Sequence, residues 1–133
     1  LHFKEGARIN PGNGSAFTGV GLAQTGLGNK TAAHDAFAQA LQINIHDVTS
    51  LYHLVKTAYE LKKFDVVSAL LEQYIRYNSV NSNILYSYAG ILYHRGLLKE
   101  ALDECDKLLS LKSDHEGAKK LRELILKKDA FKS

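Results

Sequence analysis

The feature that most constrains this chain is a period of 34 residues, which aligns apolar and small side chains three times without a gap. Four of the aligned columns are Phe17, Leu51 and Leu85; Gly21, Val55 and Ala89; Ala33, Val67 and Ala101; and Phe37, Leu71 and Cys105. A gapless register predicts that residues one period apart share one structural environment. We therefore predict three repeats, 14–47, 48–81 and 82–115, within one domain that spans residues 1–133.

Each repeat divides into two helices separated by a tight turn. In the third repeat Asn81 or Ser82 is a candidate N-cap, and apolar residues then recur every three or four positions. Gly96 follows this stripe as a C-terminal stop, and Gly28 takes the same place in the first repeat. Lys62 stands there in the second repeat, where a left-handed backbone would cost about 1 kcal/mol.

This spacing resembles the tetratricopeptide repeat, which places a large residue, a Leu-Gly pair, small residues and an aromatic at set positions in 34 residues. The first repeat matches best, through Phe17, Val20, Gly21, Ala33, Phe37 and Ala40. The second is more degenerate, because Val55, Val67 and Tyr74 stand where small residues are usual, and larger side chains would hold two crossing helices apart. The resemblance implies an all-α fold, a right-handed α-α superhelix of about three helix-turn-helix repeats.

Both ends of the chain fit the same array. Phe3, Gly6, Ile9 and Pro11 match the closing half of a partial N-terminal repeat over residues 1–13, as expected of a chain cut from a longer protein. An apolar face there would favour stacking on a second copy, so we predict a homo-oligomer through the N-terminal end. The apolar pattern of residues 116–131 predicts a C-terminal capping helix, with Ala118, Leu121, Leu124 and Ile125 on its apolar side.

The resemblance also implies where a partner binds, because the first helix of each tetratricopeptide pair lines a concave groove. The residues carried onto this groove are Thr18, Leu22, Thr49, Tyr52, Lys56, Tyr59, Asn83, Tyr86, Tyr93 and His94. Four of them are tyrosines, which interfaces favour over the Lys and Glu of solvated helix faces. The alternative is that some of these tyrosines pack against neighbouring helices.

Some tetratricopeptide domains hold the terminal carboxylate of a chaperone peptide with a clamp of Lys, Asn and Arg. Here Thr18 and Leu22 stand at the clamp positions of the first repeat, and Asn83 and Ser87 at those of the third. Lys56 is the sole basic candidate in the predicted groove. We therefore predict no carboxylate clamp, and a mildly polar, aromatic groove suited to an extended peptide or a helix.

Composition and spacing argue against other function classes. The 17 Lys and Arg exceed the 14 Asp and Glu by little and form no basic stripe, so we predict no nucleic-acid partner. No two histidines stand four residues apart, so we predict no metal site and no cofactor, and we expect surface or capping roles for the histidines. Cys105 aligns with core residues and is expected to be buried. No stretch is long and apolar enough to span a membrane, and the single cysteine permits the cytoplasmic location that we predict.

These observations predict a non-catalytic scaffold that binds a peptide or helix of a partner protein. The alternative is an accessory region of a larger enzyme, such as a bacterial glycosyltransferase or methyltransferase, in which the repeats would dock substrate. A third class, RNA binding as in pentatricopeptide arrays, is disfavoured by the 34-residue step and the weak charge.

Overall fold

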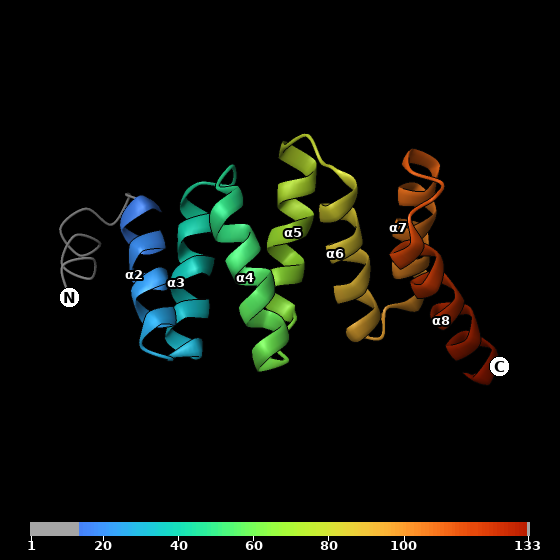
Figure 1. Ribbon diagram of the computed structural model, residues 1–133, viewed down its shortest axis with the longest axis horizontal. Helices are drawn as coiled ribbons and strands as arrows, with labels where there is room; N and C mark the ends of the chain where they lie inside the picture. Colours follow the sequence, from blue (N-terminus) through green and yellow to red (C-terminus); the bar gives the residue numbers. More distant parts are fainter. Residues whose placement is uncertain (1–13, 133) are drawn as a thin grey trace. The chain divides into compact units, whose positions relative to one another are not determined.

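The computed structural model describes residues 14–132, with side chains through Lys128, and every element in this range is a helix (Figure 1). The helices are α2 (Gly14–Gly26), α3 (Lys30–Ile43), α4 (Val48–Leu61), α5 (Asp65–Tyr77), α6 (Ser82–His94), α7 (Leu98–Leu111) and α8 (Glu116–Lys132). The predicted all-α class is confirmed. The handedness of a superhelix stays a prediction.

The helices follow the period of the sequence. Gly14, Val48, Ser82 and Glu116 begin α2, α4, α6 and α8, and each start lies 34 residues after the one before it. Asn81 is the N-cap of α6, because its side-chain oxygen accepts a hydrogen bond of 3.0 Å from the Ile84 amide. Within each unit, consecutive helices pack as adjacent antiparallel pairs, which is the predicted helix-turn-helix arrangement.

The turn inside each pair has the same backbone. Gly28 and Gly96 have φ values of 79° and 78°, and Lys62 has a φ of 56°. The following amide of each turn donates to a carbonyl five residues back, from Asn29 to Gln24, from Lys63 to Ala58 and from Leu97 to Leu92. Lys62 thus adopts the left-handed backbone, which costs a residue with a side chain about 1 kcal/mol.

The helices form two compact units, of which one ends at Asn78 and the other begins at Ser79. The N-terminal unit contains α2 to α5, and the C-terminal unit contains α6 to α8. The sequence did not predict this division. The predicted single domain and its repeat boundaries stay predictions.

In the N-terminal unit, α2 lies close against α3 because Gly21 leaves room for the Phe37 ring. A Cβ added at Gly21 would stand 2.5 Å from Phe37 Cε1. The pair α4 and α5 stays further apart, with Val55 and Val67 at the positions of Gly21 and Ala33.

In the C-terminal unit, one core joins all three helices. Ala89 and Leu92 of α6, Ala101 and Cys105 of α7, and Ile125 of α8 are all buried in it. The predicted apolar side of the terminal helix is correct for Ala118, Leu121 and Ile125, but wrong for Leu124, which is 50% exposed. Leu124 stands seven residues after Gly117 and four before Lys128, at the edge of the side that meets α6, where the core does not cover it.

The partial repeat predicted from Phe3, Gly6, Ile9 and Pro11 lies outside the described residues, as does the N-terminal surface predicted to self-associate. Among residues 14–132, no helix combines the length and the apolar character that crossing a bilayer requires.

Candidate partner-binding surfaces

The residues predicted to contact a partner lie on α2, α4 and α6, the first helices of their pairs. Thr18 and Leu22 come from α2, and Thr49, Tyr52, Lys56 and Tyr59 come from α4, in the N-terminal unit. Asn83, Tyr86, Tyr93 and His94 come from α6, in the C-terminal unit. The two sets therefore belong to different units.

The N-terminal set is largely exposed. Leu22 and Tyr52 are each 46% exposed and Tyr59 is 39% exposed, and Thr49 and Lys56 are exposed as well. The Tyr59 ring meets the Phe64 ring edge-on at 5.3 Å, which holds the tyrosine at the C-terminal end of α4. This surface offers aromatic and aliphatic area with one cation.

Thr18 differs from its neighbours because it helps to join α2 to the start of α4. Its Oγ1 lies 3.0 Å from Asp47 Oδ2 and 2.9 Å from Ser50 Oγ. Asp47 is the N-cap of α4, and its Oδ1 accepts from the Ser50 amide at 3.1 Å. Burial alone would raise the pKa of Asp47, but the hydrogen bonds from Ser50 and Thr18 outweigh it and lower the pKa. Thr18 therefore stabilises the fold.

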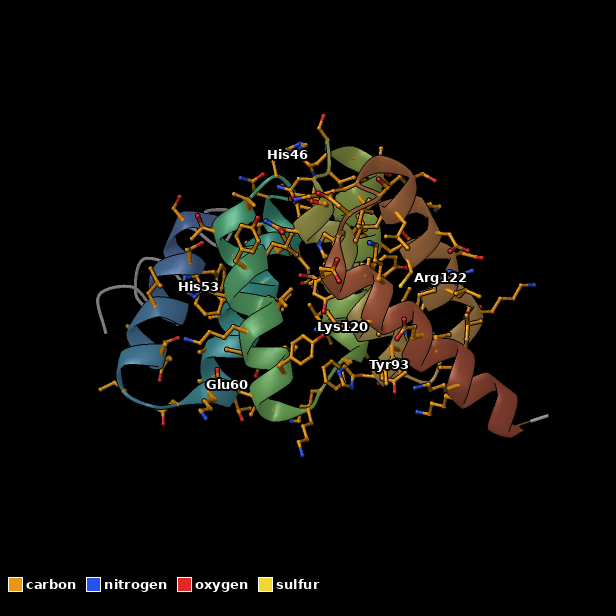
Figure 2. The ribbon with its side chains drawn as sticks, turned by 45° about the vertical axis from the view of Figure 1, so that its right-hand side comes forward. His46, His53, Glu60, Tyr93, Lys120 and Arg122 are labelled. Atoms are coloured by element: carbon orange, nitrogen blue, oxygen red, sulfur yellow. The ribbon has the colours of Figure 1, made fainter. Side chains whose placement is uncertain are left out.

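The C-terminal set meets α8. The Tyr86 ring lies 5.0 Å from the His115 ring, and a Cβ added at Gly117 would stand 2.8 Å from Tyr86 Cζ. Lys128 Nζ lies 5.0 Å from the centroid of the Tyr93 ring (Figure 2 labels Tyr93). Tyr86 nevertheless stays 39% exposed, so it packs on α8 and still presents surface, and its contact with a partner stays a prediction.

Two histidines in the N-terminal unit join α3 to α4, and sequence reasoning missed both. The His53 ring stacks on Phe37 with 4.8 Å between centroids and 12° between planes. His34 is 5% exposed, and its Nδ1 lies 2.8 Å from Thr57 Oγ1. The expected surface or capping role is therefore wrong for His34, although it is correct for His115, whose Nδ1 accepts from the Ala118 amide.

The environment of His34 fixes its protonation. Thr57 Oγ1 is 3.1 Å from the carbonyls of His53 and Leu54, so its proton is directed at its own helix and its oxygen accepts from His34 Nδ1–H. Burial lowers the pKa of His34, a contribution that Asp35 opposes and Lys63 reinforces. The imidazole is thus a neutral core group.

Cys105 was predicted to be buried, and it is. Burial raises the pKa of its thiol to about 11, with Asp106 adding to the effect. A thiol in this state is a poor nucleophile at neutral pH. Among residues 14–128, no group of three or more His, Cys, Asp or Glu side chains is placed to hold a metal ion.

A cavity of about 480 Å³ opens between α6 and α7 in the C-terminal unit. It is lined by Tyr88 and Leu92 from α6 and by carboxylates of α7, including Glu104. Lys107 Nζ pairs with Glu104 Oε1 at 3.1 Å, while within the described residues Glu104 Oε2 is buried without a hydrogen bond. The cavity is acidic, in contrast to the surface where α6 meets α8.

Comparisons with known proteins identify the fold. No protein-family model and no curated protein matches the sequence. Among solved structures, the first tetratricopeptide domain of Spaghetti (RPAP3) bound to the HSP90 peptide SRMEEVD aligns with a TM-score of 0.70 at 15% identity, over 89% of this chain and 94% of that chain.

Two further structures align over nearly all of this chain. YrrB, a tetratricopeptide protein with an unusual peptide-binding site, has a TM-score of 0.67 at 14% identity, over 98% of this chain and 68% of that one. MamA has a TM-score of 0.64 at 16% identity, over 98% and 86%. The resemblance predicted from the repeat is confirmed at the level of the fold: this chain has the fold of tetratricopeptide-repeat domains.

Proposed function

We propose that this chain is a non-catalytic scaffold that binds a peptide or helix of a partner protein on the first helices of its repeats. The observation that carries the proposal is the exposure of tyrosines at repeated positions. Tyr52 and Tyr86 stand one period apart, as do Tyr59 and Tyr93. Tyr52, Tyr59 and Tyr86 each keep 39–46% of their surface exposed. Solvated helix faces normally carry Lys, Glu and Arg instead.

Tyrosine suits such a surface for physical reasons. Its ring supplies a large contact area at the cost of few rotatable bonds, and its hydroxyl can stay hydrated at the rim of an interface. The Phe64 ring restricts the Tyr59 side chain, and the His115 ring restricts the Tyr86 side chain, before any peptide binds. Less conformational entropy is then lost on binding.

Affinity capture with a matched control tests the proposal. The test variant is Tyr52→Ala/Tyr93→Ala, and the control is Tyr77→Ala/Leu111→Ala, which removes two exposed side chains from second helices. We expect a partner captured by the wild type to be retained by the control and lost by the test variant, at unchanged circular dichroism. Retention of every partner by both variants would show that the tyrosine surface is not the binding site.

The first tetratricopeptide domain of RPAP3 is bound to the HSP90 peptide SRMEEVD. Because this chain is predicted to lack a carboxylate clamp, we expect it to gain nothing from a free C-terminus on that peptide. Thr18 bonds within the fold, Leu22 is aliphatic, and Asn83 and Ser87 carry no charge. We expect the peptide SRMEEVD to bind equally weakly with a free and with an amidated C-terminus. A clear preference for the free carboxylate in a titration would reveal a clamp built from other residues.

A further inference from the structure

The terminal helix α8 differs between its two flanks in a way that capping does not explain. On the flank away from α6, Lys119 Nζ lies 3.6 Å from Glu116, and Arg122 Nε lies 3.0 Å from Asp106. Figure 2 shows Arg122 and Lys120 leaving α8 on opposite sides. The outer flank is therefore a mixed surface whose charges are paired.

The other flank carries more lysines than carboxylates. Gly117 lies against the Tyr86 ring and Lys128 over the Tyr93 ring, which identifies the side of α8 that meets α6. Helical spacing of three and four residues from Gly117 and Lys128 places Lys120 and Lys127 at the rim of that side. Among the described residues no salt bridge within 4.0 Å involves these lysines, although Glu123 stands three residues after Lys120 and four before Lys127.

We infer that this tyrosine–lysine face, made of Tyr86, Tyr93, Lys120, Lys127 and Lys128, binds an internal acidic segment of a partner protein. The inference rests on the proposed function, whose partner class it names. Lysines outnumber carboxylates on this flank, where Glu123 is the carboxylate within helical reach of both Lys120 and Lys127 and Glu116 is paired with Lys119. The excess of positive charge favours an anionic partner, and the tyrosine rings favour one that also brings apolar or aromatic side chains. No terminal carboxylate is required, because the lysines are spread along the helix.

The spacing of the lysines specifies the segment further. Lys120 is seven and eight residues from Lys127 and Lys128, which is about 10–12 Å along a helix at a rise of 1.5 Å per residue. An extended peptide covers that distance in about three or four residues. The preferred segment thus carries acidic residues three or four positions apart, with apolar residues between them that lie on Tyr86 and Tyr93.

A peptide is favoured over a nucleic acid because the basic strip is one helix wide. It lies beside exposed tyrosine, and the adjoining cavity between α6 and α7 is lined with carboxylates that repel phosphates. An RNA oligonucleotide is nevertheless included in the test as the competing occupant.

The test measures fluorescence anisotropy with peptides of about twelve residues that are blocked at both ends. One peptide carries two pairs of Glu separated by apolar residues, and its match carries Gln in their place. We expect the Glu peptide to bind the wild type at least about tenfold more tightly than the Gln peptide, and to weaken as ionic strength rises. Lys120→Gln/Lys127→Gln/Lys128→Gln should weaken it about tenfold.

The matched control is Lys99→Gln/Lys112→Gln/Lys119→Gln, which removes the same charge from other surfaces of the C-terminal unit and should change affinity less than about twofold. Equal losses in the two triple variants would reduce the effect to general attraction and overturn the inference. So would equal binding of the two peptides, absence of binding, or tighter lysine-dependent binding of a single-stranded RNA of the same charge.

One further variant separates this inference from the proposed function. Tyr86→Ala/Tyr93→Ala is expected to weaken the Glu and Gln peptides by similar factors, since the rings contact their apolar residues. If this variant weakens both peptides while the Lys120, Lys127 and Lys128 substitutions have no effect, the scaffold function stands and the acidic partner is wrong.

Discussion

The two helical pairs of the N-terminal unit bury their shared surface with different side chains at equivalent positions. In hairpin 1, formed by α2 and α3, Gly21 faces Phe37, and the helices lie close together. In hairpin 2, formed by α4 and α5, the equivalent positions hold Val55 and Leu71, and the helices stay further apart. Phe37, Leu71 and Val67 are nevertheless all fully buried.

The difference shows that the two repeats keep the space between their helices filled although the residues at equivalent positions differ. A large ring against a glycine in hairpin 1, and medium side chains at the same two positions in hairpin 2, both keep the core of the helical pair buried. What changes is the distance between the backbones. A repeat that departs from the tetratricopeptide pattern can therefore keep its core while it shifts the surface that its helices present.

The largest expected effect comes from placing the hairpin 2 residue into hairpin 1. Gly21→Val puts a branched side chain where even a Cβ would stand 2.5 Å from the Phe37 ring, so one helix must shift. We expect the free energy of unfolding to fall by about 2 kcal/mol, despite the better helix propensity of Val. Urea denaturation measures it, and an unchanged midpoint would contradict close packing at Gly21.

A double-mutant cycle sharpens the same comparison. Gly21→Val/Phe37→Leu reproduces the pair found in hairpin 2 and removes the ring that clashes. The double variant should be more stable than the sum of the single effects predicts, with a coupling of about 1 kcal/mol or more. Strict additivity would mean that the two positions do not compensate each other in volume.

Sequence reasoning reached the parts of the structure that repeat. The helix starts, the left-handed turn at Lys62 and the burial of Cys105 all follow from the period, because each position has two counterparts that indicate its environment. The burial of His34 was missed although its counterparts, Ser68 and Leu102, are buried and half-buried, so the column did carry a signal. The hydrogen bond to Thr57 had no such signal, because it joins residues 23 apart.

The candidate surface was predictable in position but not in its contacts. Periodicity placed Tyr52 and Tyr86 on one helix face, and both are exposed in part. It could not show that Tyr86 and Tyr93 meet α8, because contacts between α6 and α8 depend on how steeply successive helices cross. The exposure of Leu124 was missed for the same reason.

The next prediction concerns pH, to which the two hairpins should respond differently. Hairpin 1 buries His34, whereas hairpin 2 buries Ser68 at the same position. Because burial lowers the pKa of His34, the unfolded chain takes up a proton below pH 6.5 that the folded chain resists. The free energy of unfolding should therefore fall as the pH decreases from 7.5 to 5.5.

His34→Leu, which copies the third repeat, isolates this contribution. Thr57 keeps its bond to its own helix, so no buried hydroxyl loses its acceptor. The variant should lose less stability between pH 7.5 and 5.5 than the wild type does. Asp47 does not interfere, because its lowered pKa places its effect below this range. Identical pH slopes for wild type and His34→Leu would refute a neutral buried imidazole.

The smallest expected effect separates the turns of the two hairpins. Lys62 has a φ of 56° where hairpin 1 has Gly28 at 79°. A side chain in the left-handed region costs roughly 1 kcal/mol, and glycine regains most of this while it loses some entropy on folding. Lys62→Gly should therefore raise the free energy of unfolding by about 0.5 kcal/mol.

The reciprocal change makes this small effect decisive. A Cβ added at Gly28 would meet nothing within 4 Å, so Gly28→Lys alters the backbone preference without creating a clash. It should destabilise the chain by about 1 kcal/mol, opposite in sign to Lys62→Gly. Both are measured by urea denaturation at neutral pH. If the two substitutions change stability in the same direction, the turns are not equivalent, and the difference between the hairpins extends from their cores to the segments that connect their helices.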